Sequence, residues 1–312
     1  MMSETVRIAT RGSKLALYQA NMVKAEIAAS FPDISIEIVI FKTTGDKVLD
    51  VSLSRIGDKG LFTKELENSL LQKDTDIAVH SLKDLPTALP EELQIGGVLP
   101  RGDCRDALVS NKNIKFKDLT SGHVVATSSL RRKAQLLMLN KGMNIIDIRG
   151  NVDTRIGKMK NGYCDAMVMA AAGLQRLGLD SYITEILEPE LLVPAVGQGA
   201  IAMQIRKNDQ RIERIVKVIN HDHTYLSTHA ERIFLHLLEG GCQIPVGCYT
   251  SLEKDIFSIT GFISNTDGSD SLKFSRSGPV DEAYNLAQNL AMSFIRKGAG
   301  EIVERIRQLN LQ

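Results

Sequence analysis

The chain has 312 residues, of which 43% are hydrophobic and 24% are charged, a balance typical of a globular protein with two or three domains. Lysine and arginine number 38 and acidic residues 37, so the net charge is near zero, which argues against a protein that binds nucleic acid through bulk charge. The N-terminal residues do not have the pattern of a secretory signal, and the longest apolar run, 166–174, is too short to span a bilayer. We therefore expect a cytoplasmic protein with no membrane and no nucleic-acid partner.

The first third of the chain alternates strand and helix patterns. An apolar run at 6–9 predicts a strand, and Ser13 is suited to cap the helix after it. The apolar stripe of that helix is expected to include Leu15, Tyr18, Met22 and Ala25. A second strand is predicted at 34–41, a helix at 61–71 and a buried strand at 77–82. This order predicts an α/β domain with a mostly parallel sheet.

The same alternation begins again near residue 100. Strands are predicted at 124–126, 144–148 and 166–170, with helices at 130–139 and 152–159 between them. These signals predict a second α/β domain.

The remaining residues predict a smaller α+β domain. A strand at 200–205 precedes a helix at 224–238, which Gly240 and Gly241 would end as a C-cap. A strand at 256–263 and a helix at 281–308 follow.

The segment Thr127-Ser128-Ser129-Leu130-Arg131-Arg132 combines a helix start with two arginines. A helix N-terminus presents free N–H groups and a positive dipole end, and arginine matches the geometry of a carboxylate. The segment is therefore a candidate anion site. An ordinary N-cap followed by a solvated arginine pair explains it equally well.

Other arginines follow predicted strands or short helices, namely Arg11, Arg149, Arg155 and Arg176. In open α/β sheets ligands bind at the carboxyl ends of the strands. Each arginine alone is better explained as a surface residue, but together they favour a cleft for a polyanion.

Asp84 lies in the segment Ser81-Leu82-Lys83-Asp84, which follows a buried strand. A carboxylate there has two interpretations: a general acid or base that also stabilises a cation, or part of an ordinary Lys–Asp turn. The residues alone favour the turn. His80 is expected to be a core or near-core residue.

Cys242 follows two glycines that free the local backbone. A helix C-terminus does not lower a thiol pKa, so spacing alone favours an inert cysteine. The four cysteines form no C-x-x-C pair, and we expect them to be reduced. The fragment His221-Asp222-His223 lacks a well-spaced third ligand, so we expect no metal.

Five segments resemble, in the same order, those of the porphobilinogen deaminase family. They are 81–86, 127–132, 149–155, 194–199 and 238–242, and they extend over nearly the whole chain.

The resemblance implies a fold class of α/β type, with two periplasmic-binding-protein-like lobes joined by two crossing strands and a third, smaller α+β domain. The expected boundaries are 1–98 with 200–217 for the first lobe, 99–199 for the second and 218–312 for the third domain.

The resemblance also implies a dipyrromethane cofactor bound by a thioether to Cys242, and a catalytic carboxylate at Asp84. The residues expected to bind substrate and cofactor are Arg11, Ser13, Ser81, Lys83, Thr127, Ser128, Ser129, Arg131, Arg132, Arg149, Arg155, Arg176 and Gln198.

The activity implied is a transferase that condenses four porphobilinogen molecules, with loss of ammonia, into the linear tetrapyrrole hydroxymethylbilane. We expect a cytoplasmic monomer whose partner is the small-molecule substrate. A solute-binding protein and the effector domain of a regulator are the alternatives. The glycine-rich, charged segment 43–60 is either a lid over the cleft or a surface loop.

Overall fold

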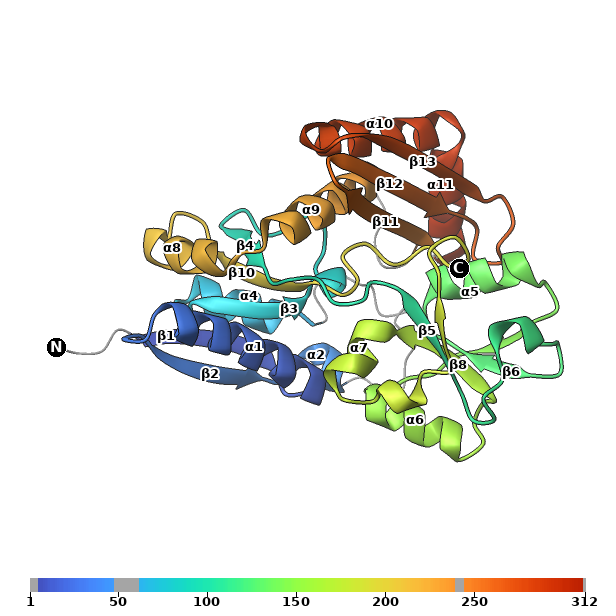
Figure 1. Cartoon of the computed structure of the whole chain (residues 1–312), viewed down its shortest axis with the longest axis horizontal. Helices are drawn as coiled ribbons and strands as arrows, with labels where there is room; N and C mark the ends of the chain where they lie inside the picture. Colours follow the sequence, from blue (N-terminus) through green and yellow to red (C-terminus); the bar gives the residue numbers. More distant parts are fainter. Residues whose placement is uncertain (1–4, 48–61, 239–243, 311–312) are drawn as a thin grey trace. The chain divides into compact units, whose positions relative to one another are not determined.

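The computed structural model describes residues 5–47, 62–238 and 244–310 (Figure 1). The described residues form two compact units. The first contains 5–47, 62–102 and 199–226, and the second contains 103–198 together with the residues from 227 onward. The chain thus leaves the first unit after Gly102 and comes back to it at Gly199.

The first unit is built on a five-stranded sheet of order β2-β1-β3-β10-β4. The strands are β1 (Thr5–Arg11), β2 (Ser35–Phe41), β3 (Ile77–Ser81), β4 (Leu93–Val98) and β10 (Ile201–Arg206). β1 is parallel to β2 and β3, whereas β10 is antiparallel to β3 and β4. A strand from beyond residue 200 therefore completes the sheet of the N-terminal lobe.

The helices of this unit are α1 (Lys14–Ser30), α2 (Thr44–Lys47), α4 (Lys64–Leu71) and α8 (Gln210–Ile219). As expected, Ser13 caps α1: its Oγ accepts a hydrogen bond from the N–H of Ala16 at 3.2 Å.

The predicted stripe of α1 is only partly right: Met22 packs against the core, whereas Tyr18 and Ala25 are exposed. The helix buries Gln19, Ala20, Val23 and Ile27, while Tyr18 is 41% exposed. Because apolar residues occur around most of α1, its periodicity does not identify the buried face; packing on β1 and α8 does.

The second unit contains a five-stranded sheet of order β7-β6-β8-β5-β9. Its strands are β5 (Asp106–Ser110), β6 (Val124–Ala126), β7 (Asn144–Ile146), β8 (Ala166–Ala170) and β9 (Glu185–Leu187). β6 is parallel to β7 and β8, and β5 is antiparallel to β8 and β9. The helices α5 (Leu130–Leu139), α6 (Val152–Lys160) and α7 (Ala171–Arg176) follow strands of this sheet.

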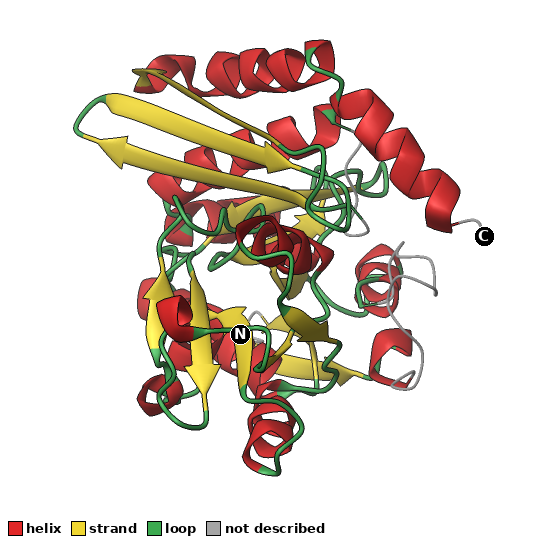
Figure 2. Cartoon of the chain, turned by 90° about the vertical axis from the view of Figure 1, so that its right-hand side faces the viewer, coloured by secondary structure: helices red, strands yellow, loops and turns green. Residues whose placement is uncertain are grey.

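The same unit contains a third, antiparallel sheet formed by β11 (Val246–Glu253), β12 (Ile256–Ile263) and β13 (Leu272–Pro279). Figure 2 shows α10 (Ala283–Arg296) along one face of this sheet. The helix α9 (Asp222–Leu237) contains the boundary between the units. The expected two sheet-and-helix lobes and smaller third domain are thus present, while their predicted residue boundaries stay predictions.

The single helix predicted at 281–308 is instead two helices, α10 and α11 (Ala299–Asn310). Gly298 separates them with a φ of +93°, a left-handed conformation that ends a helix and favours glycine. None of the helices in the described ranges is long and apolar enough to cross a membrane.

Two glycines of the second unit differ in the space that surrounds them. A Cβ on Gly261 of β12 would overlap the ring of Phe234 and lie 3.0 Å from Phe294 Cζ, whereas a Cβ on Gly157 of α6 would meet no atom within 4 Å. We expect Gly261→Ala to lower the free energy of unfolding by about 1–3 kcal/mol through overpacking. Gly157→Ala should raise it by about 0.5–1 kcal/mol, because alanine is the better helix former. Urea unfolding of both variants measures these changes. Equal changes in the free energy of unfolding would contradict the packing described.

Candidate functional site

In the first unit, predicted site residues gather where β1 and β3 end. Arg11 is the last residue of β1 and Ser81 the last of β3, and the two strands are parallel neighbours. Lys83 and Asp84 follow in a 3-10 helix, η1 (Leu82–Asp84), and Asp84 is exposed. Because carboxyl ends of parallel strands meet at one sheet edge, the first unit presents cations and a carboxylate together.

Two side chains that the sequence did not single out support this edge. The guanidinium of Arg11 lies 4.1 Å from the ring centre of Phe62, within the range of a cation–π contact. Buried Gln19 lies with its Nε2 2.9 Å from the Ser81 hydroxyl. The sequence could have indicated Gln19, because it is a polar residue in the largely apolar helix α1. No local pattern indicated Phe62.

His80 is a near-core residue, as expected, and is 6% exposed. Its Nε2 lies 3.0 Å from Gln204 Oε1, and Gln204 Nε2 donates to Glu67 Oε1 at 2.9 Å. Burial lowers the pKa of His80 to about 4, an effect that the hydrogen bond with Gln204 opposes and the nearby charge of Arg11 supports. His80 is therefore neutral in the folded protein near pH 7.

In the second unit, the segment 127–132 follows β6 and opens α5, as the sequence predicts. Its hydroxyl groups bond within the protein. Ser129 Oγ caps α5 by accepting from the N–H of Arg132 at 3.4 Å. Ser128 Oγ donates to the carbonyl of Ile148 at 2.8 Å and lies 2.9 Å from the amide nitrogen of the same residue. Thr127 Oγ1 accepts from the N–H of Ser129. These side chains shape the turn that carries the two arginines.

Arg131 and Arg132 are buried, with exposures of 5% and 6%, and are not the solvated pair of the alternative interpretation. Both guanidinium groups bind Asp106, a fully buried residue that the sequence did not single out. Arg131 Nη1 lies 2.8 Å from Asp106 Oδ2, and Arg132 Nη2 lies 2.7 Å from Asp106 Oδ1. The partner of the arginine pair thus precedes it by 25 residues in the chain.

Gln198 belongs to the same cluster and is 1% exposed. Its Nε2 donates to Asp106 Oδ1 at 2.9 Å and to the carbonyl of Cys104 at 2.8 Å. Gly197 and Gly199 on either side have φ values of +68° and +85°, a conformation that favours glycine. The two glycines therefore allow a backbone turn that directs the Gln198 side-chain amide towards Asp106.

The other three arginines of this unit are partly exposed. Arg149 follows β7, Arg176 ends α7, and Arg155 lies in α6 with its Nε donating to the carbonyl of Gly150 at 2.7 Å. Cys242 and most of the segment 43–60 lie outside the described residues. Of the other cysteines, Cys164 and Cys248 are buried and Cys104 is partly exposed.

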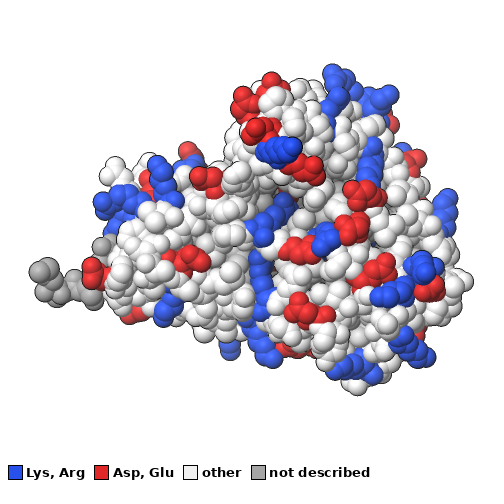
Figure 3. All heavy atoms as spheres, in the orientation of Figure 1, with Lys and Arg blue, Asp and Glu red and all other residues white. Residues whose placement is uncertain are grey.

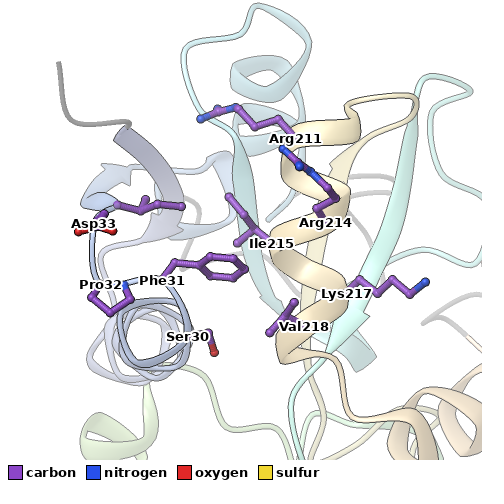
Figure 4. Close-up of a pocket in the computed structure, with 10 residues that line it drawn as sticks. Ser30, Phe31, Pro32, Asp33, Arg211, Arg214, Ile215, Lys217 and Val218 are labelled. Carbon is purple, nitrogen blue, oxygen red and sulfur yellow. The ribbon is translucent and has the colours of Figure 1, made fainter. Parts of the chain in front are cut away.

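Acidic and basic side chains are interspersed over much of the face in Figure 3, in keeping with the net charge near zero. A cavity of about 840 Å³ lies between the end of α1 and α8, lined by side chains such as Phe31, Arg214 and Lys217 (Figure 4). It contains none of the predicted site residues, and we do not assign the site to it.

Within the described ranges, no three His, Cys, Asp or Glu side chains are placed to hold a metal.

Arginines lie at strand ends in both α/β lobes, an arrangement suited to proteins that bind small anionic molecules. The chain belongs to the porphobilinogen deaminase family. The family's dipyromethane cofactor binding domain matches residues 6–214 and its C-terminal domain matches 225–296.

Curated relatives agree with this assignment over nearly their whole length. The porphobilinogen deaminase of Geotalea uraniireducens is 44% identical over 99% of this chain and 96% of its own. Those of Maridesulfovibrio salexigens and Syntrophomonas wolfei are 45% and 46% identical over 96% and 97% of this chain, and 98% and 99% of theirs. Among solved structures, the BenM effector binding domain with benzoate is 14% identical over 72% of this chain and 94% of its own, with a TM-score of 0.44, a likeness too distant to bear on function.

The pKa of His80 predicts a pH dependence of stability. Because the folded-state pKa of about 4 is below the ordinary value of 6.5, the unfolded chain binds the proton more tightly, and stability falls as the pH falls from 6.5 towards 4. Between pH 7 and pH 5 the contribution of His80 to the free energy of unfolding should decrease by about 2 kcal/mol. Urea unfolding at both pH values should show that the free energy of unfolding decreases less between pH 7 and pH 5 in His80→Gln than in wild type. An equal decrease in the two proteins would refute this account of His80.

Proposed function

We propose that this protein is the transferase that condenses four porphobilinogen molecules, with loss of ammonia, into hydroxymethylbilane on a dipyrromethane group attached to Cys242. The observation that carries the proposal is the match of both family domains, including the cofactor-binding one, to a chain whose strand ends hold the predicted arginines. We further propose a cytoplasmic monomer. Size-exclusion chromatography tests the monomer.

The arginines and the lysine would hold the carboxylates of substrate and cofactor. Each pyrrole unit carries two carboxylates, so a growing oligopyrrole needs several cationic anchors. Arg11 and Lys83 supply them in the first unit, and Arg149, Arg155 and Arg176 in the second. The partial exposure of these side chains leaves them accessible to a ligand.

Asp84 would act as the acid–base group and would stabilise positive charge. Loss of ammonia from porphobilinogen leaves an electron-poor pyrrole, and a fixed carboxylate stabilises the positive charge and relays protons. The exposed position of Asp84 in η1, directly after β3, suits a group that acts on a bound molecule.

Dipyrromethane would supply the pyrrole carbon to which the first new ring is joined. In the second unit, a buried donor fits its carboxylates: Arg131 Nε has no hydrogen-bond partner although Arg131 is 5% exposed. The thiol of Cys242 would serve as the attachment point and would need no activation for the condensation itself.

Replacing Asp84 by asparagine should lower turnover at least ~100-fold, because the shape remains while the charge and the proton relay are lost. The chain offers a matched control in Asp118→Asn. Asp118 is likewise exposed and ends a 3-10 helix, η2 (Phe116–Asp118), in the same Lys–Asp order, but it is not a predicted site residue. Asp118→Asn should keep normal turnover, and both variants should keep the cofactor mass. Near-normal turnover in Asp84→Asn would remove Asp84 from the mechanism.

The tether at Cys242 predicts an intact mass above that of the bare sequence by one dipyrromethane group. Cys242→Ser should lose this extra mass, because an alcohol is a much poorer nucleophile than a thiolate. The variant should also unfold at a lower temperature, since a ligand bound only to the folded state stabilises it.

The other cysteines are the controls for the tether. Burial raises the pKa of Cys164 to about 11, with a further contribution from Asp165, so its thiol is unreactive. Cys104→Ser, Cys164→Ser and Cys248→Ser should each keep the added mass. An adduct that survives in Cys242→Ser, or a wild-type mass equal to the bare sequence, would overturn the proposed function.

A further inference from the structure

Asp106 is the centre of a saturated hydrogen-bond cluster. It is the first residue of β5, and its side chain is fully buried. Oδ2 accepts from Arg131 Nη1 at 2.8 Å. Oδ1 accepts from Arg132 Nη2 at 2.7 Å, Arg132 Nε at 3.0 Å and Gln198 Nε2 at 2.9 Å. Four donors therefore converge on one carboxylate, which is about the number that its two oxygens can accept.

Backbone carbonyls fix the other side of each guanidinium. Arg131 Nη1 also donates to the carbonyl of Val193 at 2.6 Å, and Arg132 Nη1 donates to that of Val168 at 3.0 Å. Each guanidinium is thus held between the carboxylate and a carbonyl, so neither can turn without breaking a buried hydrogen bond. Such bonds to charged groups are strong and directional.

The charges of the cluster do not cancel. Burial by itself would raise the pKa of Asp106, but the attraction and hydrogen bonds of Arg131 and Arg132 outweigh it and hold that pKa well below its usual range. Burial lowers the pKa of Arg131, and the carboxylate opposes that shift. Two guanidinium groups and one carboxylate leave a single positive charge, and Arg131 Nε remains a buried donor without a partner. A buried unpaired donor and an uncompensated charge both favour an anion beside them.

We propose that Asp106 is a positioning residue, which holds Arg131 and Arg132 together as a rigid, singly positive cluster that takes up one carboxylate of the dipyrromethane group. This inference rests on the proposed function. Without Asp106 the two like charges would repel each other in a buried place, and their side chains would turn towards solvent. The anion site would then be lost although both arginines remain in the chain.

The test is the extent of cofactor attachment in four purified proteins, namely wild type, Asp106→Asn, Asp106→Ala and the control Asp76→Asn, measured by intact mass after incubation with porphobilinogen. Asp106→Asn keeps the volume, removes the charge and turns an amide donor towards an arginine. We expect it to carry the adduct at least ~10-fold less often than wild type, the effect of removing one partner of a buried charged pair. Asp106→Ala should lose as much, and formate, which supplies the carboxylate that this variant lacks, should restore attachment several-fold where chloride at the same ionic strength does not.

Asp76 is the matched control for a merely structural carboxylate. It is 4% exposed and binds Arg206 and Arg211, at 3.2 Å and 2.9 Å, in the first unit, directly before the start of β3. Asp76→Asn should also reduce stability towards urea, because it removes a buried carboxylate that pairs with Arg206 and Arg211. It should nevertheless attach the cofactor as wild type does.

The outcomes separate the two proposals. Wild type without the adduct would overturn the proposed function itself. Wild type with the adduct, together with a folded Asp106→Asn that attaches it equally well, would overturn the positioning role alone. An equal loss in Asp76→Asn and Asp106→Asn would also overturn it, since both would then act through stability. If Asp106→Ala does not fold, Asp106→Asn decides.

Discussion

A carboxylate cannot be buried as an ion unless cations and hydrogen-bond donors surround it, and this constraint organises the second unit around Asp106. Removing one member of such a cluster costs about 3–5 kcal/mol, because a charge is left buried and unpaired. Arg131, Arg132 and Gln198 therefore have fixed side-chain positions before any ligand arrives. A site that is ordered in advance loses less conformational entropy when a ligand binds.

Sheet topology explains why these residues meet. β5 runs antiparallel to β8, so Asp106 at the start of β5 pairs with Ala170 at the end of β8. β6 is parallel to β8 and ends at the same edge, where the segment 127–132 begins. The first unit repeats this arrangement: β10 is antiparallel to β3, and Ile201 at its start pairs with Ser81. In each sheet, one reversed strand therefore begins at the edge where the other strands end and the arginines lie.

Polar residues at these edges divide into two kinds. The hydroxyls of Thr127, Ser128 and Ser129 bond to their own turn, and Ser81 bonds to Gln19, so they build the backbone that presents the cations. The partly exposed arginines and the exposed Asp84 are the groups that, under the proposed function, would contact the bound molecule. The family resemblance assigns both kinds of residue to one binding site. Burial and hydrogen bonding separate the residues that build the backbone turn from those that are exposed.

The sequence by itself determined the features that depend on neighbouring residues. Strand and helix alternation, the cap at Ser13, and arginines after strands are local, because hydrogen bonds and side-chain periodicity act over a few residues. Tertiary structure alone decided which side of the largely apolar helix α1 is buried, since several sides satisfy the same pattern. It alone paired Asp106 with arginines 25 and 26 residues later. A buried charge takes its partners from whatever the fold brings near, and that proximity is set by the whole sheet, not by spacing along the chain.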